Sequence, residues 1–182
     1  MQASEPRVAP MSDAELGDAE MDVLAKVGDK NLNIMRTLVH HPKLLKRWLV
    51  FANHVLFKSS LPPRDREILI LRIGWLCQAP YEFSQHVVIG KDVGMTDADV
   101  DRIKAGADAE GWTPIEAQLI RATDELHANA CLSDETWQAL AAHYTTEQVI
   151  DLVFAVGNYN LVSMALNTFG VQLDAHVPNA MG

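Results

Sequence analysis

Apolar side chains recur every three or four residues along most of this chain, which is the spacing of an amphipathic helix. The pattern is clear over residues 44–56 and 114–129. Thr96 and Ser133 each precede a polar first turn, as helix N-caps do, and Gly170 is placed to end the last helix. No hairpin signal interrupts these segments. We therefore expect an all-α fold of about eight helices.

The first thirty residues divide into two parts. Residues 1–11 hold two prolines and show little periodicity, so we expect a flexible tail there. Ser12 and Glu15 have the spacing of a capping box, which predicts a helix from that point to about Val27. The folded domain should accordingly occupy residues 12–182.

The segment SSLPPRDREILILRIGWLCQ, residues 59–78, is apolar on nearly all sides once past its prolines. Prolines at this point suit the start of a helix. The β-branched residues would also fit a strand, but the length of the run and the helical patterns around it favour a helix. We expect this helix to be buried.

The composition and net charge of the chain exclude several classes of function. The 182 residues are 48% hydrophobic and 21% charged, which fits one globular domain with a sizeable core. The net charge of −9 argues against a nucleic-acid-binding surface. No stretch reaches the roughly twenty apolar residues of a membrane span, and the first residues do not look like a signal peptide, so we expect a cytoplasmic protein with no membrane partner.

The chain has two cysteines. Cys77 and Cys131 lie outside any CxxC, and we expect both to be reduced and buried.

Three polar residues in apolar surroundings form the candidate catalytic set. Glu82 and His86 are four residues apart and share one helix face, while Glu67 comes fifteen residues earlier on the preceding helix. An imidazole titrates near neutral pH and can pass a proton either way, so His86 is the candidate acid or base, with the two glutamates setting its protonation state. Two alternatives remain open: divalent-metal binding by all three, and a structural salt bridge from Glu67 to a nearby arginine. The arginines in reach are Arg64, Arg66 and Arg72.

Further residues are candidates for binding a substrate. The Tyr81 hydroxyl could donate a hydrogen bond to a substrate oxygen, and the fork of Arg72 could hold a carboxylate. His127 and the run Asn158–Asn160 are candidates for the same pocket or for a subunit interface. Each also has a structural interpretation, as a packing residue or a partner within the fold.

The stretch REILILRIGWLCQAPYEFSQHVVIGKDVGMTDADVDRI resembles the carboxymuconolactone decarboxylase and AhpD-like alkylhydroperoxidase superfamily. ATDELHANACLSDETWQALAAHY and NYNLVSMALNTFGVQLD extend the resemblance over about residues 40–172. The hydroperoxidase branch carries a glutamate, a CxxC and a histidine. Glu67 and His86 match the outer positions, but Ala79 and Glu82 stand where the two cysteines would be, so the chain resembles the thiol-free branch.

The resemblance implies an AhpD-like helical bundle that needs no cofactor and assembles as a homo-oligomer, a trimer or hexamer. The long apolar face of the last helix also favours self-association. The implied activity is that of a lyase or isomerase acting on a small carboxylated lactone or a related intermediate of aromatic catabolism. Two alternatives are a peroxidase-like antioxidant protein, which the missing dithiol disfavours, and a non-enzymatic oligomeric helical module.

Overall fold

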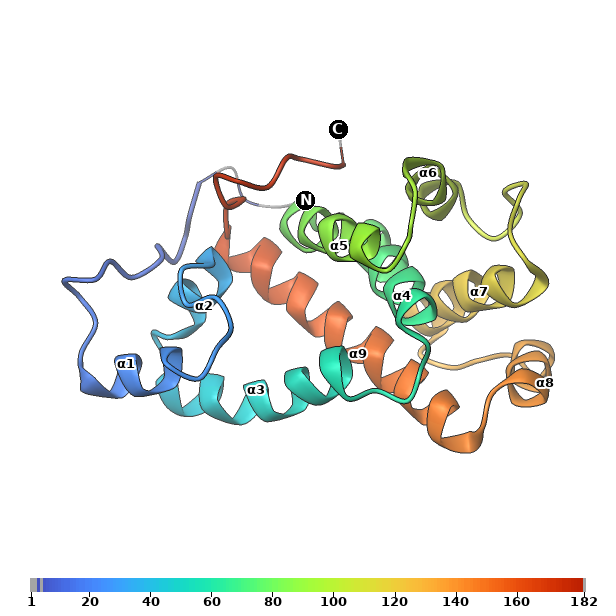
Figure 1. The fold of residues 1–182 in the computed structure, drawn as a ribbon, viewed down its shortest axis with the longest axis horizontal. Coiled ribbons are helices and arrows are strands. Elements are labelled where there is room, and N and C mark those ends of the chain that lie inside the picture. Colours follow the sequence, from blue (N-terminus) through green and yellow to red (C-terminus); the bar gives the residue numbers. More distant parts are fainter. Residues whose placement is uncertain (1–2, 4, 182) are drawn as a thin grey trace.

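The computed structural model describes residues 3 and 5–181, which form nine helices and no strand (Figure 1). The all-α prediction is confirmed. The helices are α1 (Asp18–Leu24), α2 (Asn33–Leu38), α3 (Pro42–Phe57), α4 (Pro63–Leu76), α5 (Pro80–Asp92), α6 (Asp97–Ala105), α7 (Pro114–Asn129), α8 (Asp134–His143) and α9 (Thr146–Phe169).

Helix α4 lies at the centre of the fold. It packs against α5, α6, α7 and α9 (Figure 1). Every residue from Arg66 to Gly74 is buried. The expectation of a buried helix, rather than a strand, is confirmed. Because α4 is covered on all sides, polar side chains on it must find partners inside the protein.

Local capping chemistry explains most helix boundaries. Thr96 and Thr113 each form a capping box at the start of α6 and α7, and Ser133 caps α8 through the backbone N–H of Thr136. Gly170 ends α9 with φ of 68°, in the left-handed region that favours glycine. The predicted starts and ends of these helices are therefore confirmed.

The N-terminal region departs from the prediction. Ser12 does bond Glu15, through N and Oγ at 2.8 and 2.7 Å from Oε2, but this closes an isolated turn. The helix begins later, after Gly17, and is short. A capping pair stabilises a first turn, but helix propagation also needs a following apolar face that packs. Residues 7 and 8 donate backbone hydrogen bonds to Phe169 O, at the end of α9.

Arg64 joins the starts of three helices. Its guanidinium bonds Asp99 at 2.7 Å and Glu116 at 2.8 Å, and these two carboxylates also complete the capping boxes of α6 and α7. One side chain on α4 thus fixes where two other helices begin.

Helix α9 is the most apolar helix of the described chain. By length and composition it could cross a membrane, but half of its most apolar window is buried, which is also typical of a core helix in a soluble protein. On its outer side four large apolar side chains are exposed at helical spacing: Ile150, Phe154, Leu161 and Met164. Homo-oligomerisation through such a surface stays a prediction.

Candidate active site

Glu67, Glu82 and His86 come together between α4 and α5. Glu67 lies on α4, and the short connection through Gln78, whose φ is 50°, turns the chain so that α5 packs back along α4. The two glutamates and the histidine are 0%, 4% and 5% exposed. The sequence-predicted catalytic residues therefore form one buried cluster.

The imidazole of His86 lies between the two carboxylates. Its Nδ1 is 2.7 Å from Glu67 Oε2, in a hydrogen bond, and its Nε2 is 3.0 Å from Glu82 Oε1, within ion-pair distance. The second contact lacks hydrogen-bond geometry, so the buried Oε1 of Glu82 has no hydrogen-bond partner. The cluster thus holds a fixed imidazole beside an under-bonded carboxylate.

Burial and charge act in opposite directions on His86. Burial alone disfavours the charged ring, but the negative charges of Glu67 and Glu82, with the hydrogen bond to Glu67, outweigh it and raise the pKa of His86 to about 10. At neutral pH the ring is an imidazolium. It can therefore donate a proton or stabilise negative charge, but it has no lone pair with which to act as a base.

Arg66 and Tyr159 complete the cluster. Arg66 Nε donates to Glu67 Oε1 at 3.2 Å, so Glu67 bridges the arginine and the histidine. The ring of Tyr159, on α9, meets the ring of His86 edge-on with centroids 4.8 Å apart. Burial, with the charges of Glu82 and Glu67, raises the pKa of Tyr159 well above its usual value, so its phenol stays protonated. From the sequence, Arg66 is expected only as a salt-bridge partner of Glu67, and Tyr159 only as one of several pocket candidates.

Tyr81 is buried but turned away from this cluster. Its hydroxyl donates to Asp174 Oδ2 at 2.6 Å and accepts from the backbone N–H of Ile34 at 3.3 Å. Asp174 also accepts hydrogen bonds from Gln85 and from the backbone N–H of Asn33. Tyr81 therefore fastens α5 to α2 and to the segment after α9, and the structure does not bring its hydroxyl to the Glu67–His86–Glu82 cluster.

Arg72 and His127 also lie apart from the cluster. The fork of Arg72 is filled by Asp124, at 2.6 and 3.0 Å, and Nη1 donates to the carbonyl of Ile103 at 2.7 Å. His127 is exposed near the end of α7. Arg72 therefore joins α4 to α6 and α7, with no free fork for a substrate carboxylate.

The cysteines are not arranged for dithiol chemistry. Cys131 is exposed and Cys77 partly buried, so the expectation that both are buried is wrong. Cys77 Sγ donates to Asn160 Oδ1 at 3.1 Å, and burial, with the charge of Glu82, raises the pKa of the thiol. A raised pKa disfavours the nucleophilic thiolate.

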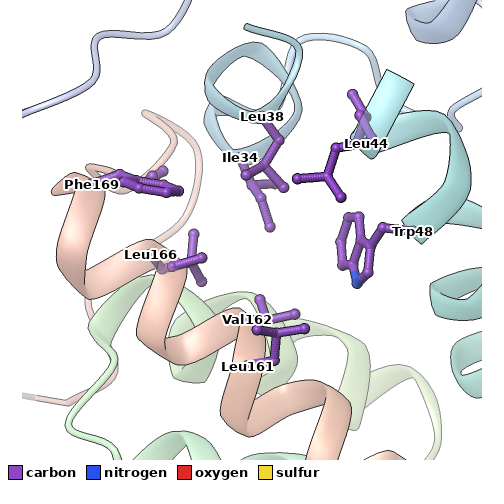
Figure 2. Close-up of a pocket in the computed structure, with 11 residues that line it drawn as sticks. Ile34, Leu38, Leu44, Trp48, Leu161, Val162, Leu166 and Phe169 are labelled. Atoms are coloured by element: carbon purple, nitrogen blue, oxygen red, sulfur yellow. The ribbon is translucent and has the colours of Figure 1, made fainter. Parts of the chain in front are cut away.

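A separate apolar pocket of about 310 Å³ opens between α2, α3 and α9. Figure 2 shows apolar side chains of these helices, among them Ile34, Trp48 and Leu166, facing one another around it. The Trp48 indole N–H donates to Asn158 Oδ1 at 3.1 Å. Within the described residues, no group of three or more His, Cys, Asp or Glu side chains could hold a metal ion.

A family comparison gives this geometry a context. Residues 42–125, which include Glu67, Glu82 and His86, match the model of the carboxymuconolactone decarboxylase family. This segment, a little under half of the chain, is similar to that family. The predicted resemblance is thereby confirmed. Curated proteins give no match to the chain.

Solved structures extend the likeness beyond the decarboxylase-family segment. An uncharacterized peroxidase-related protein with an alkylhydroperoxidase AhpD core, from Ralstonia eutropha JMP134, is 18% identical with a TM-score of 0.78, over 94% of this chain and 95% of that one. A protein of unknown function from Agrobacterium tumefaciens, linked in its description to antioxidant defence and AhpD, is 18% identical with a TM-score of 0.69, over 76% and 96%. The debrominase Bmp8, in a cysteine-to-alanine variant complexed with 2,3,4-tribromopyrrole, is 14% identical with a TM-score of 0.73, over 96% and 95%. At these identities the likeness is one of fold: the chain has the AhpD-like helical bundle.

Proposed function

We propose that this protein is a cofactor-independent lyase or isomerase of the carboxymuconolactone decarboxylase type, acting on a small carboxylated lactone or a related intermediate of aromatic catabolism. The observation that carries the proposal is the buried Glu67–His86–Glu82 cluster, in which an imidazolium lies between two carboxylates. Such a cluster holds a mobile proton and a fixed positive charge, which are the two requirements of carbanion chemistry.

The chemical step follows from those two requirements. Loss of CO₂ breaks one carbon–carbon bond, and the electron pair left behind delocalises towards the lactone carbonyl. The His86 imidazolium, held by Glu67, stabilises that negative charge. The His86–Glu82 pair then delivers its proton to carbon, which completes the shift of the double bond, and the pair regains a proton from water. Glu82 Oε1 lies 3.0 Å from His86 Nε2, so a proton can pass from the ring to this carboxylate, and we assign the final transfer to Glu82.

A thiol-dependent peroxidase is the alternative that the fold relatives suggest. Cys77 lies close enough to Glu82 for the carboxylate to affect its pKa, so it is the thiol to consider. Its raised pKa disfavours attack on a peroxide, and Cys131 is exposed on a different part of the chain. We therefore favour proton chemistry over thiol chemistry.

The deciding experiment measures CO₂ release from a panel of unsaturated γ-carboxylactones. Glu82→Gln keeps the size of the side chain but removes its proton exchange, and we expect turnover to fall by about 10² to 10⁴-fold. The turnover of His86→Gln should fall at least as far. His176→Gln, which changes an exposed histidine, should keep full turnover. Circular dichroism checks that helicity is unchanged.

Cys77→Ser separates the two chemistries. Under the proposal its CO₂ release equals that of the wild type, and peroxide reduction is absent in both. Full CO₂ release by Glu82→Gln and His86→Gln would refute the assignment of these residues. A peroxidase activity that disappears in Cys77→Ser would favour the thiol alternative.

A further inference from the structure

We propose that Arg66 anchors a carboxylate group of the substrate, with the Tyr159 hydroxyl as a second donor. The identity of the acid rests on the proposed function, but the anchor itself rests on the geometry of two side chains. From the sequence, Arg66 is expected only as a salt-bridge partner of Glu67, and Tyr159 only as part of the Asn158–Asn160 run of pocket candidates. Of the predicted binding residues, Tyr81 and Arg72 are occupied elsewhere and His127 is exposed.

Arg66 is more than nine-tenths buried yet bonds through only one of its nitrogens. It is 9% exposed, and Nε donates to Glu67 Oε1 at 3.2 Å. Neither terminal nitrogen bonds any described residue, and neither is among the fully enclosed polar atoms that lack a partner. The open side of the guanidinium therefore still reaches the space outside the protein.

Other arginines on α4 differ from Arg66, because their terminal nitrogens are bonded within the protein. Arg72, 8% exposed, fills its fork with Asp124 and two backbone carbonyls. Arg64 bonds both Asp99 and Glu116. Buried guanidinium groups are normally satisfied in this way, since an unpaired donor inside a protein costs free energy. A planar fork left open at Arg66 is the geometry that binds a carboxylate through two parallel hydrogen bonds.

Tyr159 provides the second donor. Its hydroxyl forms no hydrogen bond within the described chain and is not fully enclosed, although the residue is only 6% exposed. Its ring lies edge-on to the ring of His86, with centroids 4.8 Å apart, and the charges of Arg66, Glu67 and Glu82 all act on the phenol. A protonated phenol there can donate to an oxygen anion.

The arrangement also separates the two ends of a substrate. Glu67 lies between Arg66 and His86, bonded to one through each of its oxygens. A carboxylate on the terminal nitrogens of Arg66 is thereby separated from the His86–Glu82 pair by Glu67, and the ring of Tyr159 lies against the His86 end of this arrangement. The subsite selects an acid over its uncharged analogue.

The test measures ligand affinity, so it does not depend on whether the protein turns the ligand over. The probe is 5-oxotetrahydrofuran-2-carboxylate, a saturated carboxylactone, and its comparison ligand is the matching carboxamide, each titrated into the full chain by calorimetry. We expect the wild type to bind the acid at least tenfold more tightly than the amide, and Arg66→Gln to lose that preference, since a hydrogen bond to a charged group is worth about 10- to 100-fold in affinity. Arg66→Lys should recover part of it, because lysine restores the charge but not the fork.

Controls separate binding from folding and from catalysis. Arg47→Gln makes the same change of charge at an exposed arginine and should leave binding unchanged. Tyr159→Phe should weaken binding of both ligands less than Arg66→Gln weakens that of the acid. An unchanged acid preference in folded Arg66→Gln, or no acid preference in the wild type, would overturn the anchor. An Arg66-dependent acid preference without CO₂ release from any lactone would retain the anchor and refute the proposed reaction.

Discussion

The raised pKa of His86 predicts that the protein loses stability as the pH rises above neutral. In the folded state burial opposes the charged ring, yet the Glu67 and Glu82 carboxylates keep it protonated to about pH 10, whereas an unfolded histidine releases its proton near 6.5. The stabilisation is therefore complete below about pH 6.5 and declines as pH rises towards 10. Within this window the unfolded state binds fewer protons than the folded state, so stability must fall with pH.

The slope of the free energy of unfolding against pH is set by the single proton on His86. One group that is protonated only in the folded state lowers the free energy of unfolding by about 1.4 kcal/mol for each pH unit. His86 is the buried histidine of the described residues, the other six being exposed. Urea unfolding between pH 7 and 9 measures the slope. In Glu67→Gln the ring loses one of its two flanking charges, so the decline should end at a lower pH.

Nuclear magnetic resonance of the ring nitrogens gives an independent check. Both nitrogens of His86 should carry protons at pH 7 and keep them to above pH 9. A free energy of unfolding that is flat from pH 7 to 9, or a ring that loses its proton near pH 6.5, would show that the carboxylates do not hold the imidazolium as inferred here.

Three further predictions concern the surrounding structure. Tyr81→Phe removes the hydroxyl bond to Asp174 and should lower the free energy of unfolding by about 1–2 kcal/mol in urea titrations, so an unchanged midpoint would argue against the tie. Arg64→Ala separates the two carboxylates that it bridges and should cost about 1–2 kcal/mol, with the loss reduced at high salt. With a thiol reagent at neutral pH, exposed Cys131 should react at once and Cys77 slowly, because Cys77 is partly buried with a raised pKa; equal rates would contradict this.

The sequence predicted much of the fold because local chemistry decides it. Capping threonines and a terminal glycine set the boundaries of the later helices, and the spacing of Glu82 and His86 placed both on one face. The start of the first helix was misplaced since a capping pair can close a turn without a helix after it.

The roles of Arg72 and Tyr81 were harder to predict because their partners are distant in sequence. Arg72 is bonded by Asp124, 52 positions later, and Tyr81 by Asp174, 93 positions later. On a helix buried on every side, periodicity also cannot tell which arginine has an open fork. Arg66 differs from Arg64 and Arg72 because its terminal nitrogens have no partner among the described residues, which only the folded structure reveals.

The bond between Tyr81 and Asp174 also bears on how the protein is made. The helix that carries Glu82 and His86 is fastened by a residue in the segment that follows the last helix. During synthesis on the ribosome, α4 and α5 emerge long before Asp174, so Tyr81 and Gln85 lack their shared partner until that residue arrives. Cotranslational folding can shape the first part of the bundle, but α5 is fastened in its final place only after the segment that carries Asp174 has left the ribosome.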